Sequence, residues 1–309
     1  MIINVGGRTD IVNYYGEWLF KRFEHGFVYS RNPFYPNYVY KYPLNPDVVD
    51  CVIFCSKNYA PILKELHKIS DKYNVFCHYT ITAYGKDIEP NVPDIDTSIE
   101  TLISLSKIVG AQRIAWRYDP ILLTDFYTVK KHLETFEYMA ERLTPNVAFC
   151  IFSFVEMYKK LEKNMPEIIP FSDTDKREIL TGMGEIARKY NLRVQTCAGK
   201  EDYSRYGIMQ SGCITSEILA KANNLSFKKV AHKGNRKNCK CMPSRDIGAY
   251  DTCPNGCKYC YANKNPDIAY KNMKLHDSDS PILIGNIKDT DVIVEGKQES
   301  FLINQCRLF

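Results

Sequence analysis

Short apolar runs recur through the first 225 residues, and each is followed by a longer stretch with helical periodicity. The runs are continuous rather than alternating in polarity, which is typical of parallel strands covered on both faces. In residues 173–190 the apolar positions fall on one helical face, and Asp173 or Thr174 is placed to cap the helix. The pattern predicts strands at 2–7, 26–31, 51–56, 74–82, 113–118, 147–154 and 192–197, and helices at 11–24, 60–72, 97–109, 121–143, 155–163, 173–190 and 214–223.

This order of elements predicts an α/β fold. Seven βα units in series favour a partial or full TIM-like (β/α) barrel with right-handed crossovers, and an open doubly wound sheet is the alternative. The pattern ends near residue 225, because residues 226–281 are rich in Lys, Asn, Asp, Pro and Cys. We expect residues 1–225 to form the barrel domain and residues 226–309 to form a cysteine-rich, cluster-binding segment packed on it, where metal ligation replaces a hydrophobic core.

Composition and charge fit an ordinary globular protein, with 45% apolar and 25% charged residues. The net charge of +5 slightly favours anionic ligands. The one compact basic run, 231–240, is either a solvated loop or a phosphate-facing patch, and no nucleic-acid motif accompanies it, so nucleic acid is a disfavoured but open partner. The sequence shows no signal peptide pattern and no apolar stretch near the roughly 20 residues that span a bilayer. We therefore expect a cytoplasmic protein without a membrane partner.

Twelve cysteines in a reducing compartment indicate metal or redox chemistry more than disulfides. Cys51, Cys55, Cys77 and Cys150 lie in apolar runs and are expected to be buried thiols that pack as small hydrophobes. Seven others crowd the last third of the chain, mostly in polar or Gly-containing loops. These seven divide into a set of three and a set of four.

The set of three lies in the stretch DTCPNGCKYCYANKNP, residues 251–266. Cys253, Cys257 and Cys260 have the spacing C-x3-C-x2-C, which wraps a short loop around one face of an iron–sulfur cubane and leaves its fourth iron open. Asn255 and Gly256 supply the tight backbone that such a loop needs. The alternative is a zinc knuckle completed by Cys239 or Cys241.

The set of four is Cys197, Cys213, Cys239 and Cys241. Four thiolates are enough for a second iron–sulfur cluster or for a structural zinc ion. The alternative is that some of them are buried free thiols. We expect a second metal site, with a cluster or zinc as its occupant.

Polar side chains follow several of the predicted strands, and in parallel barrels chemistry gathers at the carboxyl ends of the strands. The basic residues among them suit an anionic substrate, which they would bind through charge-assisted hydrogen bonds. Ordinary capping and ion pairing are the alternative. His78 lies mid-strand among apolar residues and is expected to be a hydrogen-bonded core histidine. The residues at the strand ends are Arg8, Asp10, Arg31, Lys57, Asn58, Thr80, Thr82, Arg117, Asp119, Ser153, Glu156 and Glu201.

The loop with the set of three resembles the cluster-binding loop of the radical S-adenosylmethionine (SAM) superfamily, with aromatic Tyr259 before its last cysteine. The resemblance implies a [4Fe–4S] cluster on Cys253, Cys257 and Cys260, SAM on the open iron, and Tyr259 beside the adenine. It also implies that an electron from the cluster cleaves SAM to a 5′-deoxyadenosyl radical. A donor such as flavodoxin or ferredoxin would supply that electron.

Almost the full length of the chain also resembles the uncharacterised DUF1848 family. The matching stretches include RTDI (8–11), SRNPF (30–34), WRYDPI (116–121) and DIGAYDTCPNGCKYCYAN (246–263). A radical-SAM-like cysteine cluster at the C-terminus is typical of that family, and the set of four follows its pattern as well. The resemblance therefore implies a permuted form of the usual radical SAM barrel.

The sequence as a whole predicts a radical-SAM-like enzyme with a small-molecule, anionic substrate. A non-SAM iron–sulfur redox or electron-transfer enzyme is one alternative, and a zinc-stabilised, non-catalytic binding protein is the other. The expected catalytic residues are Arg8, Asp10, Lys57, Arg117, Asp119 and Glu156, and the expected cofactor-binding residues are Arg31, Asn58, Thr80, Ser153 and Tyr259.

Overall fold

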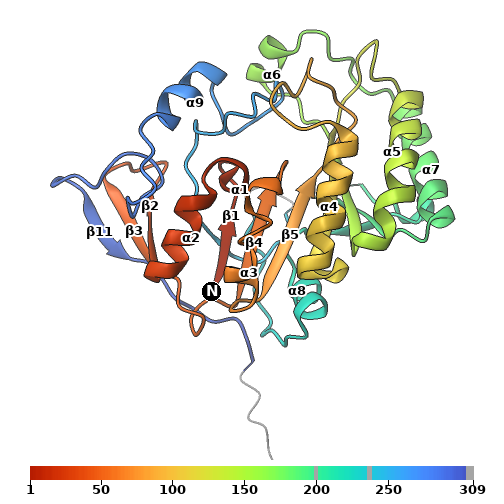
Figure 1. Cartoon of the computed structure of the whole chain (residues 1–309). Helices are drawn as coiled ribbons and strands as arrows, with labels where there is room; N and C mark the ends of the chain where they lie inside the picture. Colours follow the sequence, from red (N-terminus) through yellow and green to blue (C-terminus); the bar gives the residue numbers. More distant parts are fainter. Residues whose placement is uncertain (198–200, 235–238, 304–309) are drawn as a thin grey trace, which may run out of the picture.

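The computed structural model describes residues 1–197, 201–234 and 239–303 and contains one large sheet and one small sheet (Figure 1). The large sheet has eight strands in the order β10-β1-β4-β5-β6-β7-β8-β9, and every neighbouring pair is parallel. The α/β class predicted from the sequence is therefore confirmed. The strands are β1 (Ile2–Val5), β4 (Cys51–Ser56), β5 (Val75–Thr80), β6 (Ile114–Ile121), β7 (Phe149–Phe154), β8 (Val194–Cys197), β9 (Met209–Ser211) and β10 (Arg245–Asp246).

Helices cover one face of this sheet, because alternate strand residues on that face are apolar and pack against apolar helical stripes. Trp116 of β6, for example, stacks on Phe136 of α5 with their ring centroids 4.9 Å apart. The helix predicted to begin at residue 173 does so, and its cap is Ser172, in a capping box with Asp175, rather than Asp173 or Thr174. The helices are α1 (Ile11–Tyr14), α2 (Gly16–His25), α3 (His67–Ser70), α4 (Ile95–Val109), α5 (Val129–Leu143), α6 (Lys159–Asn164), α7 (Asp173–Lys189), α8 (Ser216–Asn223) and α9 (Pro266–Met273).

The opposite face, here called the inner face, changes from apolar to polar along the strands. Near the amino ends, Ile53, Phe76 and Ile151 form a second core with residues of α8. Further along β4 and β6 the alternation places Cys55, two residues after Ile53, and Arg117, two residues after Ala115, on this face, since side chains two residues apart point the same way. The polar part of the inner face therefore lies at the carboxyl edge of the sheet.

The predicted strand at 26–31 exists, but its place in the parallel sheet was wrong. It is β2 (Phe27–Arg31), which pairs antiparallel with β3 (Tyr38–Pro43) in the small sheet. The connection between them is too short for the crossover that parallel neighbours need, so the chain turns back as a hairpin. The third strand of this sheet is β11 (Val292–Glu295), which pairs parallel with β3.

The residues after 225 are built into both sheets. β10 extends the large sheet next to β1, and Trp18 donates a hydrogen bond from its indole Nε1 to the carbonyl of Ser280 at 2.8 Å. The backbone N–H of Met242, just before β10, donates to the carbonyl of Ile214, just after β9, at 2.8 Å. The segments beside the two edge strands therefore touch, although no ladder joins β9 to β10 within the described residues.

In the described part of the chain, no helix has both the length and the apolar character that crossing a membrane requires.

Candidate functional site

The cysteine loop, defined here as residues 251–263, lies at the carboxyl edge of the large sheet. In Figure 1 the strands of this sheet point upward, and the blue segment that leads to α9 crosses above their tips. The Tyr261 hydroxyl donates to the carbonyl of Gly7, just past β1, at 2.6 Å. The backbone N–H of Lys258 donates to the carbonyl of Ile88, which follows β5, at 3.1 Å. The loop thus spans the ends of neighbouring strands, where the sequence predicted the chemistry to gather.

Asp10 ties the loop to the end of β4. Its carboxylate accepts hydrogen bonds from the Ser56 hydroxyl at 2.7 Å and from the Lys57 backbone N–H at 3.0 Å. It also accepts from Asn255 Nδ2 of the loop at 3.0 Å and from the Asn13 backbone N–H at 3.1 Å. Burial raises the pKa of Asp10, and these four hydrogen bonds oppose that rise. Asp10 therefore positions the loop, and the catalytic role that the sequence predicted for it stays a prediction.

Glu89 gathers a second set of contacts under the loop. The Glu89 carboxylate accepts from Lys57 Nζ at 2.8 Å, from the Thr82 hydroxyl at 2.7 Å, and from the Tyr259 hydroxyl. The Lys57 and Glu89 side chains are only 12% and 3% exposed, so this ion pair is shielded from solvent. Because the Tyr259 hydroxyl is engaged here, only its ring, which packs near Tyr84, is left to contact a ligand.

The backbone of the loop is held by amides and one lysine. Gly256 has φ of 72°, a left-handed conformation that favours glycine and lets the chain turn between Cys253 and Cys257. Asn263 Nδ2 donates to the carbonyl of Cys253 at 2.6 Å. Lys160 of α6 donates to the carbonyls of Cys260, at 2.6 Å, and of Asn263. These contacts fix the loop through its carbonyl groups and leave the three cysteines as free thiols.

The burial of the three thiols bears on whether they can hold an iron–sulfur cluster. Burial raises the pKa of Cys253 and of Cys257, and Lys57 acts against this rise at Cys257. A bound metal deprotonates the thiols that coordinate it, so ligation resolves the cost of burying them. The Cys260 Sγ already accepts a backbone hydrogen bond from Ala262 at 3.3 Å. In chemistry and spacing the residues therefore fit a cubane held by Cys253, Cys257 and Cys260.

A single metal ion fits less well. Among residues 1–197, 201–234 and 239–303, no three Cys, His, Asp or Glu side chains surround one common ion position. A cubane holds its thiolates further apart than one zinc ion does, because each thiolate binds a different iron. The zinc knuckle that the sequence left open stays an alternative for this loop.

Arg117 is the main charge on the inner face. It pairs with the Asp119 carboxylate, which also accepts a hydrogen bond from the Ser153 hydroxyl. Burial acts to lower the pKa of Arg117, but Asp119 and the nearby thiols of Cys213 and Cys55 hold it above its usual range. Three strand-end residues predicted from the sequence therefore meet in one buried cluster.

Two further residues of the inner face are His78 and Cys55. His78 is buried as expected, and its ring contacts the backbone of Cys213 without the geometry of a well-formed hydrogen bond. Burial lowers its pKa to about 4, which keeps the imidazole neutral at pH 7. Cys55 is half-buried and faces Arg117, whereas Cys51, Cys77 and Cys150 are fully buried as predicted.

The set of four cysteines also meets at the inner face. The Sγ atoms of Cys213 and Cys241 lie 3.3 Å apart. Cys197 is in hydrogen-bonding contact with Cys213, and Cys239 is in hydrogen-bonding contact with Cys241. Hydrogen bonds from Cys197 and Cys241 lower the pKa of Cys213, and Arg117 adds to this effect. The four thiols thus form a chain of pairwise contacts.

Some of the remaining predicted residues lie at the carboxyl edge of the large sheet, and others lie outside it. Arg8 lies at the carboxyl end of β1, 3.9 Å from Asp246. Asn58 donates from Nδ2 to Asn13 at 2.9 Å, beside the Asp10 network, and Thr80 is buried at the end of β5. Arg31 is not brought to this edge, because β2 belongs to the small sheet and Arg31 binds both oxygens of Asp291 there. Glu156 is exposed beyond β7.

Sequence reasoning missed the residues that hold the loop: Glu89, Asn91, Lys160, Asn255 as an Asp10 partner, and Asn263. Asn263 acts within the loop, and each of the others acts through a contact between segments far apart in the chain. The polar stretch around Glu89 lies between a strand and a helix, but nothing in it indicates the contact that Glu89 makes.

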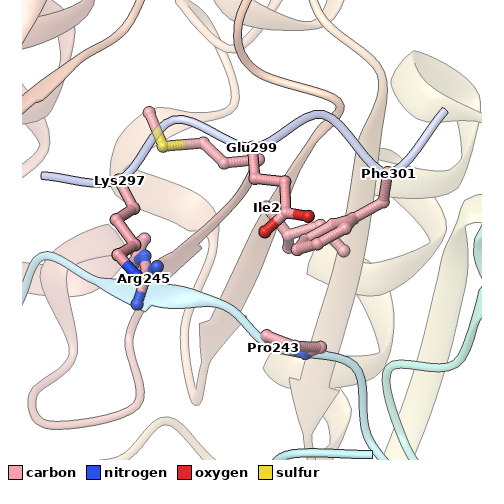
Figure 2. Close-up of a pocket in the computed structure, with 7 residues that line it drawn as sticks. Ile2, Pro243, Arg245, Lys297, Glu299 and Phe301 are labelled. Carbon is pink, nitrogen blue, oxygen red and sulfur yellow. The ribbon is translucent and has the colours of Figure 1, made fainter. Parts of the chain in front are cut away.

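Two cavities lie at opposite ends of the molecule. A cavity of ≈ 10 Å³ beside Ile2, Arg245 and Phe301 is at the amino end of β1, away from the cysteine loop (Figure 2). A larger cavity of ≈ 150 Å³ borders the loop itself and is lined by Cys257, Lys160 and other residues. The larger cavity offers a solvent approach to the cysteine loop.

The fold and the site define a class: an α/β protein in which a cysteine loop and buried charges meet at the carboxyl edge of a parallel sheet. Residues 2–262 match the family described as Domain of unknown function (DUF1848). The match covers most of the chain, so the chain belongs to this family. A comparison with curated proteins found no match.

Proposed function

We propose that this protein is an iron–sulfur enzyme of the radical SAM type that acts on an anionic small molecule. The observation that carries the proposal is the cysteine loop. Its three free thiols are held at the carboxyl edge of a parallel sheet by contacts that use carbonyl and amide groups rather than sulfur. When bound, a [4Fe–4S] cluster on Cys253, Cys257 and Cys260 supplies the electron for reductive cleavage of SAM to a 5′-deoxyadenosyl radical.

The chain's own residues divide the remaining tasks. Asp10 and Glu89 position the loop from below, and Lys57 places a positive charge beside Cys257. Arg117, balanced by Asp119, provides the buried cation for an anionic substrate on the inner face. Tyr261 lies near Cys55, Cys260 and Arg117, so it connects the loop to that cation. A substrate bound at Arg117 would therefore lie next to the cysteine loop.

We also propose that the large sheet closes into a permuted radical-SAM-like barrel, with the cysteine loop at its mouth. The hydrogen bond from Met242 to Ile214 supports closure, because it links the segments beside the two edge strands. The change of the inner face from apolar to polar supports it as well, since barrel interiors are packed and their mouths carry the chemistry.

For the electron donor, we propose an acidic protein such as flavodoxin or ferredoxin, docking over the larger cavity. Cys257, Lys160 and Lys258 line that cavity, so a negatively charged partner would meet positive charge close to the loop.

The test is anaerobic purification, iron and sulfide analysis, and electron paramagnetic resonance (EPR) of the reduced protein with and without SAM. Cys253→Ala, Cys257→Ala and Cys260→Ala should each lose close to one cluster of iron, because each removes one of three ligands. Cys150→Ala, at a buried thiol of β7, is the matched control and should keep its iron.

Two outcomes would contradict the proposal. An unchanged iron content in all three loop variants would show that these cysteines do not hold the cluster. An EPR signal that is indifferent to SAM would favour the second candidate, an iron–sulfur redox enzyme that does not use SAM.

A further inference from the structure

Two cysteines of the set of four are held side by side by the backbone. Cys213 follows β9 and Cys241 precedes β10, and the Met242 N–H donates to the Ile214 carbonyl at 2.8 Å between the two segments. Gly212 permits this approach, because a Cβ there would lie 2.9 Å from the backbone nitrogen of Cys241. The two Sγ atoms are 3.3 Å apart as a result.

That geometry suits a disulfide better than a metal. A disulfide bond measures about 2.05 Å, so the two sulfurs need to approach by only roughly 1 Å more. A metal ion needs three or four ligands around one point, and no three candidate ligands are so arranged in the part of the chain that the structure describes. Cys197 touches Cys213 and Cys239 touches Cys241, which extends the chain of contacts without creating a common centre.

We propose that Cys213 and Cys241 form a redox-active dithiol that closes reversibly to a disulfide, in place of the second metal site that the sequence suggested. This proposal does not depend on the cysteine loop or on SAM. It assigns a two-electron thiol centre to the inner face, beside the buried Arg117 guanidinium.

The oxidant is a small-molecule disulfide, and the exchange balances in two steps. The Cys213 thiolate, which is partly buried, attacks one sulfur of the small disulfide and releases the other half as a thiol after protonation. The Cys241 thiol then loses its proton and attacks Cys213 Sγ, which forms the protein disulfide and releases the second small thiol. The two electrons that the two cysteines lose thus reduce the small-molecule disulfide to two small-molecule thiols.

The experiment treats the full chain, purified without metal addition, with oxidised glutathione, blocks the remaining thiols, and maps the tryptic peptides. Cleavage after Arg205, Lys221, Lys240 and Arg245 puts Cys213 in 206–221 and Cys241 in 241–245, while Cys239 falls on a separate peptide. We expect the loss of two free thiols per chain and a linked pair of these two peptides. Dithiothreitol should restore both thiols.

Variants sharpen the test. Cys213→Ser should leave no adduct at Cys241, Cys241→Ser should stop at a mixed disulfide on Cys213, and Cys150→Ser should behave like the unmodified chain. A link between any other pair, or a mixed disulfide on Cys213 of the unmodified chain that never closes, would overturn the proposal. A bound metal would overturn it as well. That outcome is about one equivalent of zinc or iron per chain, which protects the thiols from glutathione and is lost in Cys213→Ser. The mapping of the unmodified chain decides the question even if a variant does not fold.

Discussion

Lys57 and Glu89 illustrate how single residues support the cysteine loop. Their ion pair is almost fully buried, and Glu89 also binds Thr82 and Tyr259. Removing one partner of such a pair leaves the other charge buried without compensation, which costs far more than the pair itself is worth. Lys57 was predicted from its position after a strand. Glu89 was not, because nothing in its sequence neighbourhood indicates a contact with Tyr259, which lies far along the chain.

Glu89→Gln is therefore expected to lower the free energy of unfolding by about 3 kcal/mol, because it leaves Lys57 unpaired. The matched control is Glu134→Gln, whose partner Lys130 is 86% exposed and 3.8 Å away, and it should cost less than about 1 kcal/mol. Urea unfolding measures both. Equal losses in the two variants would contradict the role given to the buried pair. Adding Lys57→Met to Glu89→Gln should recover part of the loss.

At the scale of elements, the ends of β1 and β4 must approach closely to place Asp10 and Lys57 under the loop. Gly6, just past β1, has φ of 135°, and a Cβ there would lie 2.2 Å from the carbonyl oxygen of Cys55. The apolar runs predicted these strands and their buried faces well, since burial on both faces leaves a continuous pattern. They did not predict which strands become neighbours, which is why β2 was assigned to the wrong sheet.

Gly6→Ala should lower the free energy of unfolding by about 2 kcal/mol or more, because the new methyl group overlaps the Cys55 carbonyl. Gly285→Ala is the control, since Gly285 also has a positive φ, of 69°, but no atom within 4 Å of the added Cβ. It should cost about 1 kcal/mol from backbone conformation alone. Thermal and urea unfolding would show the difference, and a Gly6→Ala protein as stable as Gly285→Ala would contradict this reading of the strand ends.

At the scale of the molecule, the segment after residue 225 completes the sheets that the first part begins. β10 pairs with β1, and β11 pairs with β3. The backbone N–H of Phe301 donates to Asp50, whose carboxylate also lies 3.0 Å from the N-terminal amine of Met1. The sequence pattern predicted a cysteine-rich segment packed on the barrel, because β10 has only two residues and no helix follows β11 within the described residues.

A chain that ends at residue 225 is therefore expected to lose cooperative unfolding, because it lacks both added strands and the partners of Trp18 and Asp50. The full chain, unfolded under the same conditions, is the control. Calorimetry and near-ultraviolet circular dichroism measure the difference. A sharp, single transition in the shorter chain would show that the first 225 residues fold by themselves.

The sequence by itself determined what local patterns encode. These are the α/β class, the larger strands and helices, and the buried thiols of Cys51, Cys77 and Cys150, while the C-x3-C-x2-C loop as the centre of chemistry stays a prediction. Periodicity and cysteine spacing are properties of short stretches, so they can be read without a fold.

Only the tertiary structure decided how these parts meet. It placed Glu89 under Tyr259, gave Arg31 to the small sheet, and put Cys213 beside Cys241. Each of these depends on which strands and loops become neighbours. That choice is made by packing over the whole chain rather than by any short stretch of it.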